Sequence, residues 1–359
     1  MHIGASHGAS PIAYLTGLPP LPSQRQPSRE IPCSILVDYR TMLCVILGAG
    51  FSCLGGVPLA LQLFDERPEV DRVSRERLVE SVVGRWEKWR LRNGGSPEEY
   101  LSELEQDSPH GYQEAVRFVA LRIALPMGKI EYVGGRGPTL TRHNVNRTTG
   151  IPSHEHFWTS IFSRTTDVAV LTTNYDILPE RGIRHVPRLR VHRPGFHYGA
   201  GPERLAGGGY LSYAHIQEIA VSGRVPLYKL HGSISWSVRD GLLVKYHDCR
   251  PAVRGDAAIV APITEKRLPQ FLDPIWRGAA SCLAASRLWI VAGYSLPSYD
   301  LAVRRLLRDN AVHNPHIHVF DPRPEVAAAF SDLLPGSPVR PHGGVPSGLQ
   351  ELEMVVASA

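Results

Sequence analysis

The side chains of this sequence that could do chemistry gather at the ends of short apolar runs. His231 follows the run 227–230, and Asn174 and Asp176 follow the run 168–171. A histidine can accept a proton near neutral pH, and an asparagine offers both a donor and an acceptor. Together such side chains could hold and deprotonate a hydroxyl group or a water molecule.

A glycine-rich loop follows another apolar run, residues 42–47. It reads Gly-Ala-Gly-Phe-Ser over residues 48–52. Glycine permits a tight turn and lets backbone N–H groups approach a phosphate closely. The dinucleotide fingerprint has a third glycine three residues after Gly50, where this chain has Cys53. An ordinary turn therefore explains the loop equally well when it is considered alone.

Two further clusters follow the runs 288–292 and 317–320. The first contains Gly293 and Ser295, and the second begins with Asp321. Because the carboxyl ends of parallel strands lie at one edge of a sheet, all these clusters can converge on one crevice. Each could be a simple strand-end cap, but their shared position favours a binding site.

The elements that must position these residues alternate between strand and helix. This pattern predicts an α/β fold: a Rossmann-like, doubly wound, mostly parallel sheet of about six strands. The expected strands are residues 42–47, 168–171, 227–230, 258–261, 288–292 and 317–320. Residues 66–126 are charged and have helical periodicity, so we expect an inserted helical module over about 66–165, between the first two strands.

The rest of the chain is expected to flank one catalytic domain, residues 42–335. Residues 1–41 are rich in Pro, Ser and Gly, which indicates a disordered tail or a misassigned start with Met42 as initiator. Residues 336–359 are expected to form a C-terminal tail.

The composition of the chain bears on its binding partners, its metal content and its cellular compartment. The net charge of +5 over 359 residues is modest, so nucleic-acid binding is not expected, and the basic segment 181–204 is more typical of a surface or subunit interface. The five cysteines include no C-x-x-C pair, which fits the reducing cytoplasm and predicts no cysteine zinc site or other metal centre. We expect neither a signal peptide nor a membrane span, because glycines and Pro58 interrupt the uncharged stretch 42–61.

Several motifs together resemble one family. GAGFS (48–52), TTNYD (172–176), KLHGSISW (229–236), GYSLP (293–297) and the strand-end Asp321 occur in the order found in sirtuins. They are more closely similar to the prokaryotic, NAD-hydrolysing branch that acts in antiphage defence. The resemblance covers about residues 42–335 and implies that NAD⁺ is the substrate.

The resemblance also implies residue roles. It implies a loop along the NAD⁺ pyrophosphate, a second turn that contacts phosphate, and a carboxylate that binds the adenosine ribose. The NAD⁺-binding residues that it implies are Gly48, Ala49, Gly50, Phe51, Ser52, Thr173, Gly293, Ser295 and Asp321. A hydroxyl such as that of Ser52 can donate to a phosphate. Asn174 and Asp176 match residues at the nicotinamide ribose and amide, and His231 matches the catalytic histidine.

The departures from the sirtuin deacylases bear on the reaction. Pro58 leads to Leu-Ala-Leu over residues 59–61 instead of Asp-Phe-Arg, and Thr173 replaces a glutamine. The four-cysteine zinc module and a recognisable acyl-lysine channel are also absent from the sequence. These changes put lysine deacylation in doubt and make water the expected nucleophile.

The sequence thus predicts an NAD⁺ glycohydrolase that depletes NAD⁺ as a defence effector, with His231 as general base and Asn174 positioning ribose or water. The alternatives are an NAD-dependent protein deacylase and a non-catalytic NAD-binding regulatory subunit. A dehydrogenase would leave the second and third motifs unexplained. The resemblance further implies control within a homo-oligomer or by an ATPase or Argonaute-type partner subunit. Linear and cyclic ADP-ribose both remain open as products.

Overall fold

The computed structural model describes residues 42–70, 73–132, 138–141, 151–186, 196–199, 204–205, 225–239, 241–246, 248–263, 268–345 and 347–357. The chain divides into two compact units, residues 1–37 and 38–359, and every described residue belongs to the second. The expectation for residues 1–41 lies outside the described residues, as does most of the basic segment 181–204.

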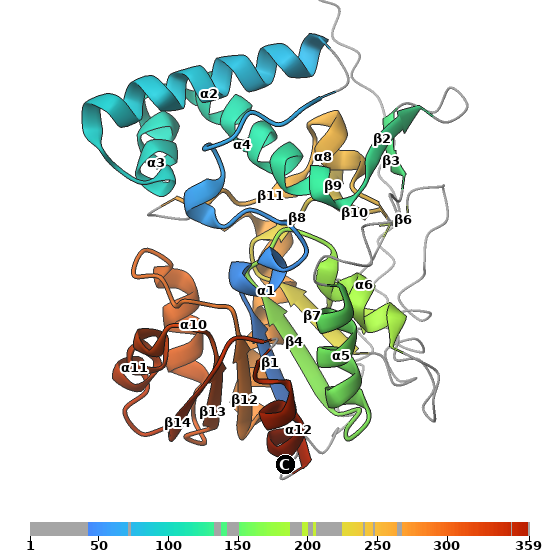
Figure 1. The fold of residues 1–359 in the computed structure, drawn as a ribbon, viewed down its shortest axis with the longest axis vertical. Coiled ribbons are helices and arrows are strands. Elements are labelled where there is room, and N and C mark those ends of the chain that lie inside the picture. The colour runs from blue at the N-terminus through green and yellow to red at the C-terminus, as the bar shows by residue number, and fades with distance from the viewer. Residues whose placement is uncertain are drawn as a thin grey trace, which may run out of the picture. The chain divides into compact units, whose positions relative to one another are not determined.

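A seven-stranded sheet forms the centre of the fold (Figure 1). Its spatial order is β14 (Val339–His342), β13 (His316–Phe320), β12 (Leu288–Ala292), β1 (Leu43–Leu47), β4 (Val168–Thr172), β7 (Val225–Lys229) and β5 (Phe196–His197). All six neighbouring pairs are parallel. Because β1 lies between β12 and β4, the order reverses at β1, which is where such sheets form a crevice. The predicted α/β fold class is confirmed.

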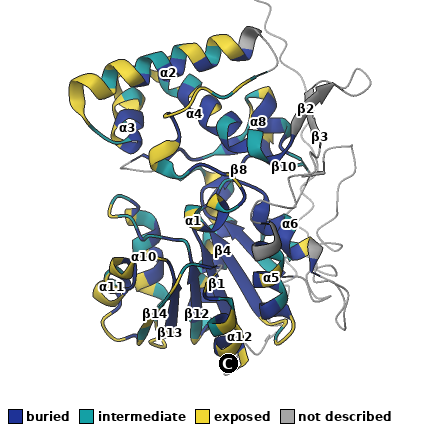
Figure 2. Ribbon diagram, in the orientation of Figure 1, coloured by how far each residue is buried: buried dark blue, intermediate teal, exposed yellow. Residues whose placement is uncertain are grey.

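Helices pack on this sheet and share one apolar core with it. They are α5 (Ile151–Phe162), α6 (Leu178–His185), α9 (Asp273–Ala285), α10 (Leu301–Asn310), α11 (Pro324–Leu333) and α12 (Leu349–Ala357). Figure 2 shows β1 and β4 buried along their length, and β12 is buried except at its first residue, Leu288. Continuous apolar runs of this kind are typical of parallel strands covered on both faces.

A helical module lies between β1 and β4 in the chain, as predicted. It consists of α2 (Val73–Asn93), α3 (Pro97–Asp107) and α4 (Pro109–Ala124), and α8 (Arg250–Arg254) packs on α4. The module has its own core, in which Phe64 contacts Trp86, Tyr100 and Phe118 at ring-centroid distances of 5.3–5.5 Å. Figure 2 shows exposed positions along α2, the amphipathic pattern expected of a helix at the surface.

The module ends earlier than the sequence predicts. The sequence predicts an insertion up to about residue 165, but α5 packs on the main sheet, with Phe157 and Trp158 in the sheet's core. Between α4 and α5 in the chain lie β2 (Lys129–Tyr132) and β3 (Pro138–Thr141), which form an antiparallel pair. Periodicity identifies a helix but not the core that its apolar face joins.

The expected strand at residues 258–261 does not belong to the main sheet. Only Ala258–Ile259 of this run forms a strand, β11, which pairs antiparallel with β8 (Gly232–Ser233) in a separate two-stranded sheet. The chain turns back through Leu230 and His231 after β7, and this reversal presents β8 to β11. The prediction of a strand in the parallel sheet is wrong here, since a short apolar run does not identify its partner.

The end of the chain also differs from the expected tail. β14 forms the edge of the main sheet, and α12 packs beside α5, where Glu353 accepts hydrogen bonds from His156 and Ser160, each at 3.2 Å. Pro341 lies within β14 and obscured it, because proline in a strand is confined to an edge or a bulge. The remaining short elements include α1 (Ala49–Cys53), β6 (Arg204–Leu205) and the antiparallel β9–β10 hairpin (Trp236–Arg239, Leu242–Lys245).

Candidate active site

A cavity of about 790 Å³ lies at the carboxyl ends of the main strands and is also lined by residues of the helical module. Nine of the twelve site residues predicted from the sequence line it: Ala49, Gly50, Thr173, Asn174, Asp176, His231, Gly293, Ser295 and Asp321. They come from loops that are far apart in the chain. The parallel topology brings these loops to one edge of the sheet.

The glycines of the first loop are required by a second loop that packs directly against them. A Cβ at Gly48 would lie 2.5 Å from the Cα of Tyr294, and one at Gly293, where φ is +62°, would lie 2.1 Å from the Phe51 amide nitrogen. The Gly50 N–H donates to the Gly293 carbonyl at 2.9 Å. The Gly50 amide is therefore bonded to the protein, so the glycines serve loop packing rather than phosphate contact through this N–H.

Three predicted contacts, Gly48, Phe51 and Ser52, do not line the cavity. Phe51 is fully buried and stacks on His154 of α5 at a ring-centroid distance of 4.4 Å. The His154 Nε2 lies 2.6 Å from the Phe51 carbonyl oxygen. Burial lowers the pKa of His154, which favours the neutral ring that donates to this carbonyl. Phe51 thus anchors the loop to α5.

Asn174 is held by two hydrogen bonds from its side-chain amide. Its Nδ2 donates to the Gly48 carbonyl at 2.8 Å and to the Ser52 hydroxyl at 2.9 Å. Both amide protons of Asn174 are therefore hydrogen-bonded, one of them to Ser52, which does not line the cavity. Among the described residues nothing donates to the Asn174 Oδ1, and Asn174 lines the cavity. A hydroxyl or a water in the cavity could donate to this oxygen.

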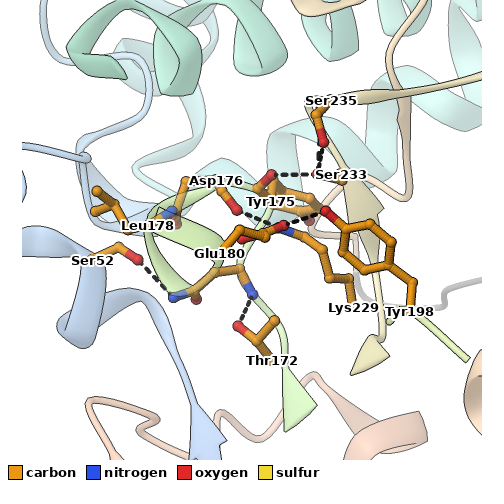
Figure 3. A network of polar contacts seen from close by, with 11 residues as sticks. Ser52, Thr172, Tyr175, Asp176, Leu178, Glu180, Tyr198, Lys229, Ser233 and Ser235 are labelled. Carbon is orange, nitrogen blue, oxygen red and sulfur yellow. Dashed lines mark hydrogen bonds and ion pairs between the residues drawn. The ribbon is translucent and has the colours of Figure 1, made fainter. Parts of the chain in front are cut away.

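Asp176 lines the cavity but is engaged with the backbone. Its Oδ1 accepts from the Leu178 N–H at 2.8 Å, at the first residue of α6. The Lys229 ammonium donates to the Asp176 carbonyl and to Glu180 Oε1, the latter at 3.0 Å (Figure 3). The Tyr198 hydroxyl also donates to Glu180, at 3.0 Å. This buried network joins the end of β7 to α6 and fixes the chain two residues before His231.

His231 faces an acidic residue that the sequence analysis missed. Its Nε2 lies 3.5 Å from Asp300 Oδ1, and both side chains are 3 % exposed. The Tyr294 hydroxyl donates to the other carboxylate oxygen of Asp300 at 3.3 Å. Burial, and then the Asp300 charge, raise the pKa of Tyr294, so its hydroxyl stays protonated. Asp300 lies three residues after the GYSLP motif, and this short separation is the feature of the sequence that could have indicated it as a site residue.

The helical module contributes a second unforeseen carboxylate. Glu98 lies in the first turn of α3 and is only 3 % exposed, and it lines the cavity together with Tyr299. Burial, and then Glu98, raise the pKa of Tyr299. Ser96 caps α3, with its hydroxyl accepting from the Glu99 N–H at 3.3 Å, and this cap fixes the turn that carries Glu98. In the sequence Glu98 is one acidic residue among many on α3.

At the far end of the cavity, Asp321 is paired with Arg323. The guanidinium donates to both carboxylate oxygens, from Nε at 3.0 Å and from Nη2 at 3.3 Å, and the Arg323 N–H adds a bond of 3.0 Å. Both residues line the cavity. Because each ionised oxygen can accept more than one bond, the Asp321 carboxylate can still accept from a ligand hydroxyl.

Comparison with known proteins gives a likeness of structure only. The sequence matches no protein-family model and no curated protein. One similar solved structure is a Sir2 enzyme studied for its mechanism and regulation, with 14 % sequence identity, 89 % of this chain and 93 % of that chain covered, and a TM-score of 0.43. Another is a Sir2 homologue in complex with NAD, with 16 % sequence identity, 88 % of this chain and 90 % of that chain covered, and a TM-score of 0.44. We infer the activity of this chain from its own residues.

Among the described residues, no group of three or more His, Cys, Asp or Glu side chains is placed to hold a metal ion. No helix in that part of the chain has the length and apolar character needed to cross a membrane.

Proposed function

We propose that the protein hydrolyses the bond between nicotinamide and ribose in NAD⁺, giving nicotinamide and ADP-ribose. The observation that carries the proposal is the convergence of Asn174, His231 and the glycine loop on one cavity. A hydrogen-bond acceptor and a base are then available in the same space as the loops that the sirtuin resemblance assigns to the dinucleotide.

Hydrolysis of the bond between nicotinamide and ribose needs few protein side chains. Departure of nicotinamide leaves an oxocarbenium-like ribose, as in other glycoside cleavages, and water adds to it. Asn174 Oδ1 accepts from the ribose hydroxyl or the attacking water and fixes its position. His231 accepts the proton that the water loses. Asp176 supports the Asn174 segment through its bond to the start of α6.

The proposed pose places the rest of NAD⁺ along the sheet edge. The pyrophosphate lies by Ala49, Gly50, Gly293 and Ser295, and Thr173 lies beside the nicotinamide ribose. Asp321 accepts from the adenosine ribose, as a carboxylate does in many dinucleotide sites. Three residues would not contact NAD⁺ but hold the loop and Asn174 in place: Gly48, Phe51 and Ser52.

The test is to incubate purified protein with NAD⁺ and resolve the products by chromatography, with and without an acyl-lysine peptide. We expect nicotinamide and ADP-ribose in equal amounts, independent of the peptide. Nicotinamide release only with peptide would mean a deacylase, and NAD⁺ binding without turnover in every assembly state, including the complex with a partner subunit, would mean a regulatory NAD-binding module. Either result would overturn the proposal.

We also propose that this activity serves defence in the cytoplasm and is controlled by assembly, with a second copy or with an ATPase or Argonaute-type subunit. An NADase that is always active would harm its own cell. Turnover measured over a range of protein concentrations, alongside the mass in solution, tests this. Activity should rise with assembly, and full activity of a dilute monomer would contradict it.

A further inference from the structure

Asp300 occupies the position of a helix cap without acting as one. It directly precedes α10, and its side chain makes no capping hydrogen bond to that helix. An aspartate in this position commonly stabilises a helix by accepting a hydrogen bond from a backbone N–H of its first turn. Its carboxylate oxygens instead lie 3.5 Å from His231 Nε2 and 3.3 Å from the Tyr294 hydroxyl. The side chain is thus directed to the base of the proposed reaction.

The surroundings of Asp300 make its contact with His231 important. A buried carboxylate is costly unless a positive charge or hydrogen bonds offset it. Burial, and then the negative charges near them, including that of Asp300, raise the pKa of Tyr175, Tyr294 and Tyr299, so these groups remain neutral hydroxyls beside Asp300. Glu98 lies beyond Tyr299 and adds a negative charge on the module side.

On the helix side, Arg304 also lies near Tyr294, but its Nη1 donates to the Leu296 carbonyl at 3.0 Å. An imidazolium at His231 would bring the positive charge within 3.5 Å of Asp300 Oδ1. Charge at this position would therefore be stabilised by the carboxylate.

We propose that Asp300 is the positioning residue of His231. Its carboxylate accepts the proton on Nε2 and so keeps Nδ1 as the basic nitrogen. When Nδ1 takes the proton of the attacking water, Asp300 stays ionised and stabilises the imidazolium. The water O–H bond breaks as the N–H and C–O bonds form, and neutral nicotinamide departs with the electron pair of the C–N bond. This role rests on the proposed hydrolysis.

Three variants separate this role from a structural one. Asp300→Asn offers a carboxamide that can donate to Nε2 and favour the wrong tautomer, so kcat should fall roughly 10²- to 10⁴-fold with KM little changed. Asp300→Ser could cap α10 but carries no charge, and it should lose as much activity. Asp300→Glu retains the carboxylate and should recover part of the rate.

A second readout does not need turnover. In protein with ¹⁵N-labelled histidine, His231 is assigned by comparison with His231→Gln, and NMR reports its tautomer and pKa. Wild type should carry its neutral-state proton on Nε2, and Asp300→Asn should move it toward Nδ1 and lower the pKa by about one unit. The acidic limb of the pH–rate profile should shift the same way.

The outcomes distinguish the two proposals. Loss of the Nε2 tautomer in Asp300→Asn supports the positioning role even if wild type hydrolyses no NAD⁺, which would refute only the proposed function. An active wild type with an equally active Asp300→Asn and an unchanged tautomer would overturn the role of Asp300. Activity of Asp300→Ser equal to wild type would show that the carboxylate is not needed, and it would also overturn the role of Asp300.

Discussion

Asn174 and Ser52 illustrate how one hydrogen bond can set the orientation of a reactive group. The Ser52 hydroxyl accepts one of the two amide protons of Asn174, at 2.9 Å, and is fully buried. Removing that acceptor leaves a buried N–H unsatisfied, which costs about 1–3 kcal/mol. It also lets the amide rotate, so that Oδ1 is no longer directed consistently.

We therefore expect Ser52→Ala to reduce kcat for nicotinamide release by at least about tenfold, with a smaller change in the Kd for NAD⁺. Ser281→Ala is the matched control, because Ser281 bonds only within α9, at an exposed position. Steady-state kinetics and titration with NAD⁺ check this. If Ser52→Ala weakened NAD⁺ binding at unchanged kcat, Ser52 would contact the ligand directly, as the sequence alone predicts.

The residue types of the site could be predicted from the sequence, but their partners could not. Asn174, His231 and Asp321 all follow apolar runs, and the fold brings them to one cavity. Glu98 and Asp300 were missed because their positions depend on how α3 and α10 pack against the sheet edge. The sequence also does not reveal that the Ser52 hydroxyl accepts from Asn174, because the motif does not show which side of the loop faces that residue.

At the scale of elements, the contact between β7 and α6 depends on a buried ion pair. Lys229 and Glu180 are almost completely buried and 3.0 Å apart. Removing one partner of such a pair commonly costs about 3–5 kcal/mol, because the other charge is left uncompensated. Lys229→Met should therefore destabilise the fold by about this amount, as measured by urea unfolding.

The double variant Lys229→Met with Glu180→Gln is the control for this prediction. It removes both charges and should recover much of the lost stability, since no uncompensated buried charge remains. If the double variant were no more stable than Lys229→Met alone, lost packing rather than charge would explain the defect.

The outer strands β13 and β14 carry a pair of stacked histidines. His318 Nδ1 and His342 Nε2 are 2.9 Å apart. Burial, and then the neighbouring His342, lower the pKa of His318 from 6.5 to about 4. Between these values the unfolded chain binds a proton that the folded chain does not, so stability is present above pH 6.5 and is lost as the pH falls toward 4.

Thermal unfolding between pH 7 and pH 4.5 should show this loss. His318→Phe cannot bind a proton, so its Tm should depend less on pH over that range than the Tm of wild type. His313→Phe is the control, because His313 is exposed after α10. An unchanged pH dependence in His318→Phe would show that other groups cause the acid sensitivity.

Strand prediction succeeded for the centre of the sheet and failed at its margins. β1, β4 and β12 are continuous apolar runs, which in a parallel sheet are buried on both faces. β14 contains a proline and has exposed positions, so its sequence is not distinguishable from a loop. β11 is too short for its sequence to specify a partner strand.

At the scale of the whole described unit, the cavity joins residues from two cores. The sheet core supplies the strand-end loops, and the helical module supplies Glu98 and Ile123. A ligand that binds only the folded chain stabilises it by about 2.7 kcal/mol at a concentration of 100 Kd. NAD⁺ should therefore raise the Tm of wild type.

Asp321→Ala is the informative variant for this measurement, because it removes the carboxylate proposed to hold the adenosine ribose. Its Tm without ligand should be close to that of wild type, with a higher NAD⁺ concentration needed for the same increase. An identical NAD⁺ response in the variant would place the adenosine ribose elsewhere.

The most direct test of the account is nicotinamide release from NAD⁺ by wild type, Asn174→Ala and His231→Ala, with the Kd for NAD⁺ of each measured in parallel. We predict nicotinamide and ADP-ribose from wild type, and at least a hundredfold loss of turnover in both variants, with folding and NAD⁺ binding retained. Full turnover in either variant would contradict the assignment of the cavity as a glycohydrolase active site.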